Sequence, residues 1–383
     1  MGSDDFDRPK LPTRPLVDGN IPRNGYPHHS FRFQSLGRWS QRYLRPTESD
    51  LEKMEPILEI QELRIEFETF EGTSQVLDGI HLTLGRRDTL GLVGETGCGK
   101  SITAKAILRL LPIPPARIVS GEILFEGEDL LKKSEEEMKE IRGRRIAMVF
   151  QDPMTFLNPV FTIEEQLVDV ILAHGKGDDS IFQGERLNRK RAVGKAIELL
   201  GEVKIPQPEL RIKSYPHEFS GGMRQRVLIA MALSRSPQIL IADEPTTALD
   251  VTIQAQILWL INDLVQRHGH SVLLISHDLG VVARVCRRIA VMYAGSIVEN
   301  CSTVQLFKRP LHPYTRGLLN SILTFSKRES EAQGIKGVIP DLIQPPSGCR
   351  FHPRCFEMME ICKKEKPSMI EIEEGHWVSC HLY

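Results

Sequence analysis

Long hydrophobic runs are missing from this sequence. Its richest apolar segments, such as HSVLLISH at residues 270–277, have the length of single strands. A membrane-spanning helix needs about 18 apolar residues in a row. The sequence therefore gives no indication of a transmembrane segment.

An excess of charge of one sign is missing as well. The chain carries 49 Lys and Arg residues against 50 Asp and Glu residues, which leaves a formal net charge of −1. Proteins that hold nucleic acid through its phosphates usually present a broad positive surface. The charge balance therefore argues against nucleic acid as a partner.

The N-terminus does not have the pattern of a secretory signal peptide. The chain opens with MGSDDFDRPK, which has acidic residues where a signal peptide has basic residues and then an apolar stretch. This predicts a cytoplasmic protein, in which thiols stay reduced. The seven cysteines are therefore interpreted as metal ligands or small core residues before disulfides.

The pattern along the chain predicts three regions. Residues 1–53 are polar and rich in Pro, Arg and Asp, which predicts a disordered or loosely docked extension. Residues 54–310 alternate apolar strands with helical segments, which favours an α/β fold with a parallel sheet. Residues 152–236 are mainly helical and form a predicted insertion within it, and residues 311–383 form a C-terminal extension.

Residues 94–101, GETGCGKS, match the phosphate-loop pattern G-x-x-x-x-G-K-[ST]. The loop follows a predicted strand, TLGLVG, and precedes a helix predicted over residues 100–111. Its backbone N–H groups and the helix N-terminus can bind phosphates, Lys100 can neutralise them and Ser101 can coordinate Mg²⁺. The predicted nucleotide contacts are Gly94, Glu95, Thr96, Gly97, Cys98, Gly99, Lys100, Ser101 and Ile102.

Polar residues end three other apolar strands. Asp243 ends ILIAD and is a candidate ligand for Mg²⁺, and Glu244 follows as the candidate general base. Gln151 ends RRIAMVFQ and could bind Mg²⁺ or water. His277 ends HSVLLISH and could contact a γ-phosphate, although a histidine at a strand end is often structural. Together with the loop, these residues predict a site for Mg²⁺ and ATP.

A second predicted anion-binding site is the segment Ser220–Gly221–Gly222, which precedes an apolar helix. At this point the sequence resembles the ATP-binding-cassette (ABC) ATPases over about residues 57 to 310. The order of phosphate loop, Gln151, SGG, Asp243–Glu244, Ala248–Leu249–Asp250 and His277 is that family's order. Met223 departs from it, since the family usually has Gln there.

The resemblance implies a P-loop NTPase fold with a RecA-like core, an antiparallel β subdomain and an inserted helical subdomain. It implies ATP hydrolysis and head-to-tail pairing of two cassettes, in which Ser220, Gly221 and Gly222 of one complete the phosphate site of the other. Asp250 would then lie at the interface between the two cassettes. An aromatic platform for adenine is expected before the loop, with Phe67 the first candidate and Phe70 the second.

Other segments are similar to the ATPases of oligopeptide and dipeptide importers. They are Gln151–Asp152–Pro153–Met154, Leu157–Asn158–Pro159, FSGGMRQRV and Leu311–His312–Pro313–Tyr314–Thr315. This implies a peripheral subunit on the cytoplasmic face of the cell membrane that powers peptide import. Its partners would be a second ATPase subunit, expected to be a paralogue, two transmembrane permease subunits and an extracellular solute-binding protein.

Other functions stay open on the sequence alone. Related importers carry oligosaccharides or nickel. A soluble ABC ATPase of iron–sulfur assembly or DNA repair is a further alternative, and so is a metal-dependent regulatory module with an inert phosphate site. The presence of Asp243, Glu244 and His277 together favours hydrolysis over the inert module.

Cys349, Cys355, Cys362 and Cys380 form the pattern C-x5-C-x6-C-x17-C. Four thiolates can hold Zn²⁺ or an iron–sulfur cluster. The C-terminal region resembles that of the peptide-importer ATPases, which implies a [4Fe–4S] cluster, with Zn²⁺ as the alternative. We expect the metal to have a structural role, because the extension is too short for a large core of its own.

Overall fold

The computed structural model describes residues 55–173, 188–247, 249–321 and 334–383. The N-terminal extension predicted over residues 1–53 lies outside the described residues. All of the described residues belong to one compact unit, Glu52–Tyr383.

An antiparallel sheet of four strands begins the described chain. Its order is β2-β1-β4-β5, formed by β1 (Pro56–Thr69), β2 (Gly72–Gly85), β4 (Ala116–Phe125) and β5 (Glu128–Asp129). The apolar alternation of β1 changes phase at Glu62, which has φ +48° and lies at a shift in the strand register. This bulge returns Leu63 and Ile65 to the buried face that Leu58 and Ile60 also occupy.

The larger sheet has eight strands in the order β11-β12-β10-β9-β3-β8-β7-β6. The strands are β3 (Thr89–Val93), β6 (Ile146–Val149), β7 (Ile239–Asp243), β8 (Ser271–Ser276), β9 (Arg288–Tyr293), β10 (Ser296–Ser302), β11 (Ile370–Glu373) and β12 (His376–Val378). Strands β9, β3, β8, β7 and β6 are parallel, which confirms the predicted parallel sheet. All residues of β3, β7 and β8 are buried, as expected of strands covered on both faces.

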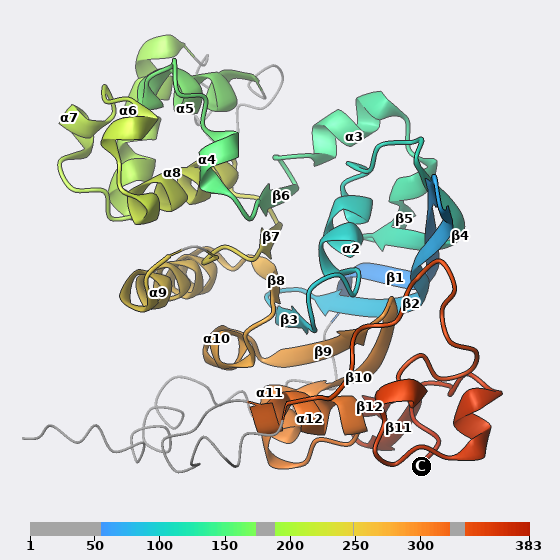
Figure 1. Ribbon diagram of the computed structural model, residues 1–383. Coiled ribbons are helices and arrows are strands. Elements are labelled where there is room, and N and C mark those ends of the chain that lie inside the picture. The colour runs from blue at the N-terminus through green and yellow to red at the C-terminus, as the bar shows by residue number, and fades with distance from the viewer. Residues whose placement is uncertain (1–54, 174–187, 248, 322–333) are drawn as a thin grey trace, which may run out of the picture. The chain divides into compact units, whose positions relative to one another are not determined.

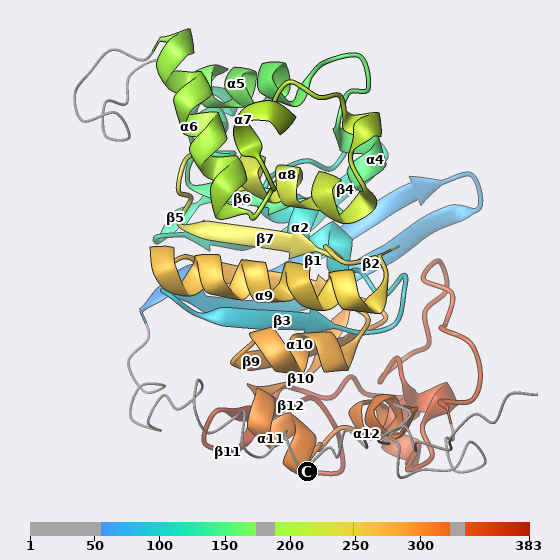
Figure 2. The same cartoon turned by 90° about the vertical axis from the view of Figure 1, so that its left-hand side faces the viewer.

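Two hydrophobic cores lie on opposite faces of this sheet, because neighbouring residues of a strand point to opposite sides. In β7, Leu240 packs into one core, while Ile239 and Ile241 pack into the other. One core is covered by α9 (Val251–His268) and α10 (Leu279–Val285), and the other by the antiparallel sheet and α2 (Lys100–Ile107) (Figures 1 and 2). The phosphate-loop segment joins β3 of the larger sheet to α2, which packs in the same core as the antiparallel sheet.

Helix α2 is shorter than the sequence suggests. The apolar pattern predicts a helix through Leu111, but α2 ends at Ile107. Arg109 adopts φ +51°, and the N–H of Leu110 donates to the carbonyl of Lys105 at 2.8 Å. This left-handed closure satisfies carbonyls at the end of the helix before Pro112 is reached.

The described part of the chain between β6 and β7 is helical and lies to one side of the sheet in Figure 1. It contains α4 (Pro153–Phe156), α5 (Ile163–Ala173), α6 (Arg189–Glu202), α7 (Pro208–Arg211), the 3-10 helix η3 (Pro216–Glu218) and α8 (Gly221–Leu233). The apolar sides of α5, α6 and α8 pack against one another and continue into the core next to α9. Beside β5 lie η2 (Leu130–Lys132) and α3 (Glu135–Ile141).

The C-terminal extension is joined to the larger sheet. It contains α11 (Thr303–Lys308), α12 (Pro313–Ser321), the 3-10 helices η5 (His352–Arg354) and η6 (Glu360–Lys363), and the β11–β12 hairpin. Strand β12 pairs antiparallel with β10, so that Glu299 lies opposite Val378. The cysteine-rich segment is thus held beside the turn that joins β9 to β10 (Figure 1).

Candidate nucleotide-binding site

The phosphate-loop segment leads from β3 to α2, and its glycines are required by close approaches of the backbone. A Cβ atom on Gly94 would lie 2.1 Å from the carbonyl oxygen of Met292 in β9. Gly99 has φ +110°, and a Cβ atom there would lie 2.7 Å from side-chain atoms of Leu77 and Met292. The loop can therefore curl tightly over the end of the sheet only with glycine at these positions.

Lys100 is buried within this loop, at 4% exposure. Its Nζ donates to the carbonyl oxygens of Gly94 at 2.9 Å and Glu95 at 3.0 Å. The ammonium group therefore lies inside the curve of the loop, at the N-terminus of α2. Positive charge, backbone N–H groups and the helix dipole meet at this point, which is the arrangement that binds phosphate groups.

Ser101 and Asp243 meet across the start of α2 and the end of β7. The Ser101 hydroxyl donates to Oδ1 of Asp243 at 3.0 Å. Burial raises the pKa of Asp243, the Ser101 hydrogen bond opposes that shift, and the neighbouring charge of Glu244 adds to it. A hydroxyl and a carboxylate are hard oxygen ligands of the type that Mg²⁺ prefers, so these two residues fit the predicted metal.

Two of the predicted residues, Gln151 and His277, converge on the side chain of Glu244. Gln151 Nε2 donates to Oε2 of Glu244 at 2.9 Å, and Nδ1 of His277 lies 3.2 Å from Oε1. Thr247 Oγ1 also donates to Oε2, at 2.9 Å. A role for Thr247 was not predicted from the sequence. The feature of the sequence that could have indicated it is a hydroxyl residue three positions after the acidic Glu244.

The backbone of Glu244 explains why it points away from Asp243. Glu244 has φ +44°, a left-handed conformation that is uncommon for a residue with a side chain. Its N–H still donates to the carbonyl of Ile275 at 2.9 Å, so the residue remains attached to β8. Asp243 can thus face Ser101 while Glu244 faces the ends of β6 and β8. In the part of the chain that the structure describes, no hydrogen bond joins Gln151 to Asp243 or Ser101.

Ser220 is the N-cap of α8, and its Oγ accepts from the N–H of Met223 at 3.4 Å. Ser220 is exposed, whereas Met223 packs against the core, which accounts for an apolar residue where the family usually has Gln. A Cβ atom on Gly222 would lie 2.5 Å from Cγ2 of Ile253 in α9. The start of α8 therefore fits closely against α9.

Comparison with known proteins identifies two family regions in the chain. The ABC transporter family matches residues 77–247, and the C-terminal region of the oligopeptide/dipeptide transporters matches residues 298–362. A probable peptide ABC transporter ATP-binding protein of Sinorhizobium fredii is 50% identical over 329 residues, which are 86% of this chain and 95% of that protein. The oligopeptide transport ATP-binding protein of Bacillus subtilis is 48% identical, over 85% of this chain and 88% of that protein.

This chain belongs to the ATP-binding proteins of ABC transporters.

Solved structures agree with this cassette fold. The dimeric structure of a bacterial ABC transporter cassette superposes with a TM-score of 0.56 at 24% identity, covering 64% of this chain and 98% of that chain. The structure of cbiO1 of Clostridium perfringens, part of the ABC transporter complex cbiONQ, gives a TM-score of 0.54 at 25% identity, covering 66% of this chain and 91% of that chain. The part of the ABC ATPase that superposes is therefore the cassette, and the rest of the chain is additional.

Two further predicted contacts of the ABC ATPase lie at the ends of elements. Asp250 is exposed and is the N-cap residue of α9. Phe67 is half-buried in β1 and packs against the core, whereas Phe70 is fully exposed at the turn between β1 and β2. The structure thus distinguishes the two candidates for the adenine platform by their exposure, and Phe67 remains the first prediction.

The four thiols of the C-terminal extension lie near one another in the ABC ATPase. The N–H of Cys349 donates to the carbonyl of Cys362 at 2.8 Å. Burial, with smaller contributions from the other three thiols, raises the pKa of the Cys349 thiol to about 11. Nevertheless, no three of these sulfur atoms lie within 4.8 Å of one another among the described residues. Four thiols are a donor set that either Zn²⁺ or an iron–sulfur cluster would take.

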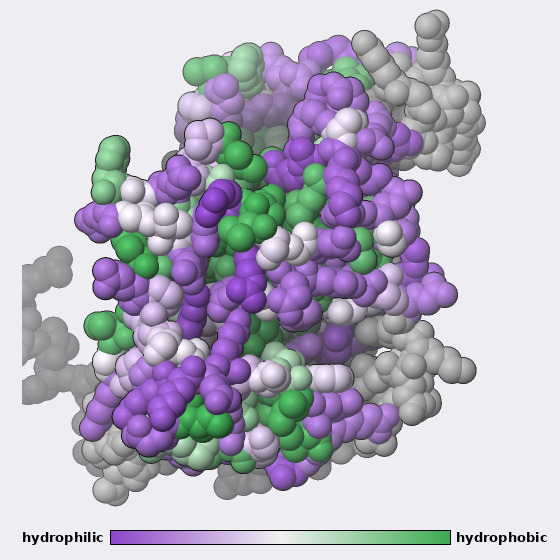
Figure 3. Space-filling view, turned by 90° about the vertical axis from the view of Figure 1, so that its right-hand side faces the viewer, coloured by the Kyte–Doolittle hydropathy of each residue, from purple (hydrophilic) through white to green (hydrophobic). Residues whose placement is uncertain are grey.

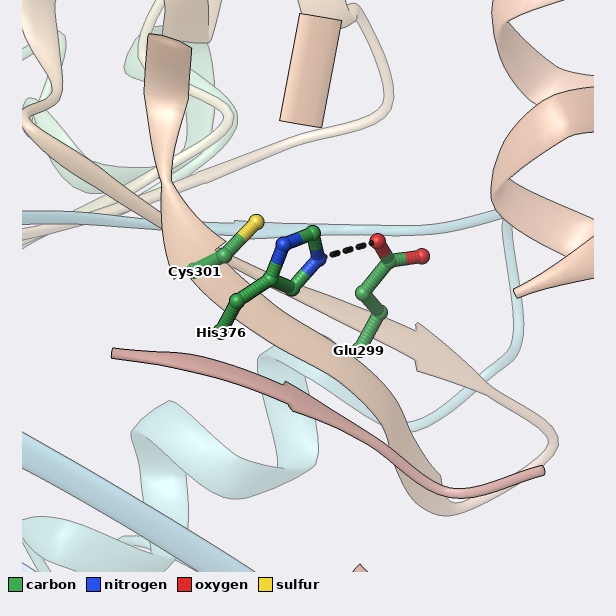
Figure 4. Close-up of side chains that lie close together, drawn as sticks. All are labelled: Glu299, Cys301 and His376. Atoms are coloured by element: carbon green, nitrogen blue, oxygen red, sulfur yellow. Dashed lines mark hydrogen bonds and ion pairs between the residues drawn. The ribbon is translucent and has the colours of Figure 1, made fainter. Parts of the chain in front are cut away.

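Glu299, Cys301 and His376 form a separate buried group whose ligand-type atoms lie within 4.8 Å of one another (Figure 4). The carboxylate of Glu299 already accepts hydrogen bonds from the N–H groups of Leu311 and His312, at 2.8 and 2.9 Å. Its Oε1 also lies 2.8 Å from Nε2 of His376. Because this carboxylate is fully bonded within the protein, we interpret the group as a buried clasp between β10, β12 and the start of α12.

None of the described helices of the ABC ATPase is long and apolar enough to cross a bilayer. One side of the molecule is mostly hydrophilic, with hydrophobic residues in several separate groups (Figure 3). A groove lined mainly by apolar residues lies next to the helical region. The groove has a volume of about 310 Å³.

Proposed function

We propose that this ABC ATPase powers a membrane importer of short peptides. The observation that carries the proposal is the combined match of the cassette and of residues 298–362, the latter to the C-terminal region of oligopeptide/dipeptide transporters. The relatives that are 44–50% identical over more than four fifths of this chain include peptide, oligopeptide and dipeptide transport ATP-binding proteins. The proposed solute class, short peptides, is taken from the names of these relatives.

In this proposal, Lys100 and the loop bind the phosphates of ATP, while Ser101 and Asp243 hold Mg²⁺. Mg²⁺, when bound, neutralises charge that develops on the phosphate oxygens. Glu244 accepts a proton from the attacking water or orients it. Gln151 and His277 hold the Glu244 carboxylate at its two oxygens, so that a shift of either strand end would move the base.

A second cassette, expected to be a paralogue, completes the site in this proposal. Ser220 and its glycines lie at the exposed N-terminus of α8, and among the described residues no hydrogen bond joins them to Gly94–Ser101. They are therefore free to bind the phosphates held by another cassette. Asp250 would lie at the seam between the two. ATP then joins the two cassettes, and its hydrolysis lets them separate.

The apolar groove supplies the proposed link to the membrane subunits. It is lined by the end of α2, by β6 and by α4 and α8. The lining residues are Leu108, Leu110, Arg142, Gly143, Ile146, Ala147, Met148, Val149, Phe150, Phe156, Leu228, Met231 and Ala232. Phe150 and Phe156 stack here at 4.2 Å, and Phe156 remains about half exposed. An amphipathic helix of a permease subunit fits a groove of this kind.

Gln151 follows Phe150 directly, so the groove and the proposed base are neighbours in the chain. Movement of a permease helix in the groove would therefore reach Glu244 through Gln151. The ATPase would bind peripherally to the cytoplasmic face of the membrane, with two permease subunits and an extracellular solute-binding protein.

The four thiols are proposed to hold a [4Fe–4S] cluster, with Zn²⁺ as the alternative. The four-cysteine donor set and the match of residues 298–362 to the C-terminal region of the oligopeptide/dipeptide transporters support the cluster. Protein purified without oxygen should then contain iron and show broad visible absorbance. Stoichiometric zinc without iron would reject the cluster.

Reconstitution tests the importer directly. The ATPase, its partner cassette and the permease subunits would be placed in vesicles, with a solute-binding protein and a panel of peptides, oligosaccharides and nickel. We expect peptide uptake that depends on ATP. Uptake of only sugars or nickel would reject peptides as the solute class. Failure to associate with any permease would favour a soluble ABC ATPase.

A further inference from the structure

The C-terminal extension contacts the phosphate loop directly. We infer that Arg354 and Tyr314 are positioning residues for ATP: they fix the shape and the charge of the loop, so that the four-thiol segment sets the affinity for Mg·ATP. The inference rests on the proposed role of residues 94–101 in binding ATP, and it does not depend on the solute.

Arg354 forms a two-pronged ion pair with Glu95, the second residue of the loop. Its two terminal nitrogens lie 2.6 and 3.1 Å from the two carboxylate oxygens. The Arg354 side chain is 6% exposed and that of Glu95 is 27% exposed. Arg354 is itself held by the carbonyl of Lys336 at 3.1 Å and by the ring of Tyr293. The guanidinium is therefore held on several sides and largely shielded from water, which strengthens its charge interaction with the partly exposed carboxylate.

The ion pair has a consequence for anion binding. Glu95 places a carboxylate in a loop whose proposed ligand is a triphosphate. The guanidinium of Arg354 neutralises that carboxylate, and Glu95 in turn raises the pKa of Arg354 through the hydrogen-bonded pair. Without Arg354, a negative charge would remain beside the bound phosphates and repel them.

Tyr314 holds the same residue through the backbone. The N–H of Glu95 donates to the hydroxyl oxygen of Tyr314 at 2.9 Å. Tyr314 is fully buried and packs against the rings of Tyr293 and Phe351, with centroids 4.6 and 5.4 Å away. An aromatic cluster from β9, α12 and the cysteine-rich segment thus supports the start of the loop.

Arg350 adds a second connection farther along the loop. Its Nη1 donates to the carbonyl of Ala294 at 2.6 Å, in the turn between β9 and β10. The N–H of the next residue, Gly295, donates to the carbonyl of Cys98 in the loop at 2.9 Å. The extension therefore supports the phosphate loop at Glu95 directly and at Cys98 through one turn.

Both arginines lie on the short segment between Cys349 and Cys355, which includes η5. The segment is closed by the hydrogen bond from Cys349 N–H to the Cys362 carbonyl. The clasp of Glu299 and His376 holds the β11–β12 hairpin against β10 (Figure 4). Cys380, the last of the four thiols, follows this hairpin in the chain. Whatever holds the four thiols together therefore also holds Arg350 and Arg354 in place.

The test measures the dissociation constant of Mg·ATP on the full chain, in a Glu244→Gln background that prevents hydrolysis. Arg354→Ala should weaken binding by roughly 10-fold, and Arg354→Gln, which keeps donors without the charge, by a similar factor. Glu95→Gln added to Arg354→Ala should recover most of the loss, because the unpaired carboxylate is gone. Tyr314→Phe should weaken binding by about 3-fold.

Arg316→Ala is the matched control. Arg316 also forms an ion pair within the extension, in which its Nη1 donates to the two carboxylate oxygens of Glu357 at 3.0 and 3.1 Å, but it has no contact with the loop among the described residues. We expect this variant to bind Mg·ATP as the parent does. Equal affinities of the Arg354 and Arg316 variants, or a double variant no better than Arg354→Ala, would overturn the inference. Loss of Mg·ATP binding in the parent would instead reject the proposed nucleotide site.

A second measurement separates positioning from loss of structure. If Arg354→Ala fails to fold, Arg354→Gln and Arg354→Lys carry the comparison, with thermal unfolding and iron content recorded for each variant. In reconstituted transporters with Glu244 restored, Arg354→Gln should raise the KM for ATP and leave kcat nearly unchanged. A fall in kcat with an unchanged KM would contradict a role in positioning ATP.

Discussion

Gln151 donates from its side-chain amide to Oε2 of Glu244 at 2.9 Å, although 93 positions separate the two residues in the chain. Each residue follows a strand of the larger sheet, and the helical region joins those strands. The proposed catalytic base is thus fixed by a residue that begins the connection to the groove. In the proposed mechanism, this hydrogen bond would link chemistry at the phosphate to movement in the helical region.

Replacing Glu244 by Gln should lower the rate of ATP hydrolysis by about 10² to 10⁴-fold, because the amide cannot accept the proton of the attacking water. Binding of Mg·ATP should persist, since Ser101, Asp243 and Lys100 are unchanged. Single-turnover hydrolysis and ATP binding measured on the same protein test both halves. Hydrolysis at the normal rate would remove Glu244 from the mechanism.

Replacing Lys100 by Ala should weaken ATP affinity by about 10 to 100-fold, because the charge inside the loop is lost. The loop should also become less rigid, as the hydrogen bonds to the carbonyls of Gly94 and Glu95 disappear. Calorimetric titration with Mg·ATP measures the effect. Lys139→Ala, at an exposed position of α3, is the control and should bind normally. Unchanged affinity of Lys100→Ala would contradict the assignment of the loop.

Gly222→Ala should lower the free energy of unfolding by about 1 to 3 kcal/mol, because the new methyl group would lie 2.5 Å from Ile253. It should also displace Ser220 and reduce hydrolysis by paired cassettes. Gly201→Ala in α6 is the opposite case, since among the described residues no atom beyond its own helix backbone and chain neighbours lies within 4 Å of its Cβ position. That change should stabilise the protein by about 0.5 to 1 kcal/mol. Denaturant unfolding of both variants measures their free energies of unfolding. Equal effects of the two substitutions would contradict this prediction.

Stability should fall as the pH drops from about 6.5 to 4 because of His312. Burial lowers the pKa of this histidine to about 4, with Arg316 contributing and Glu299 opposing. In that interval the unfolded chain binds a proton that the folded protein does not, so acid favours unfolding, by up to about 3 kcal/mol. The pKa of Glu299 is lowered, so its own loss of stabilisation begins only below its ordinary value of 4.5.

The variant His312→Asn tests whether His312 causes this loss of stability in acid. Nδ1 of His312 accepts the N–H of Tyr314 at 3.0 Å, and an Asn side-chain oxygen can replace it as an acceptor. The free energy of unfolding, measured at pH 7, 6 and 5, should fall less steeply in the variant. His270, whose pKa burial also lowers, is common to both proteins and leaves the comparison unaffected. Identical slopes would assign the acid sensitivity to other groups.

The sequence by itself determined the features that depend on local pattern. Apolar runs of five or six residues predicted the buried strands, and glycine, lysine and serine at fixed spacing predicted the loop between β3 and α2, because strand burial and tight turns constrain neighbouring residues. The polar residues that end separate strands could be grouped because parallel strands share one edge. The end of α2 was misplaced, since the pattern does not reveal a left-handed Arg109.

Only the tertiary structure decided which distant residues meet. Arg354 lies 259 positions from Glu95, and Tyr314 lies 219 positions from it, so no periodicity connects them. The sequence predicted four thiols as metal ligands, but not that the segment between the first two supports the phosphate loop. That contact exists because β12 pairs with β10 and carries the C-terminal extension to the turn beside the loop. Such pairings arise from how sheets and side chains pack across the whole chain, and a local pattern does not contain them.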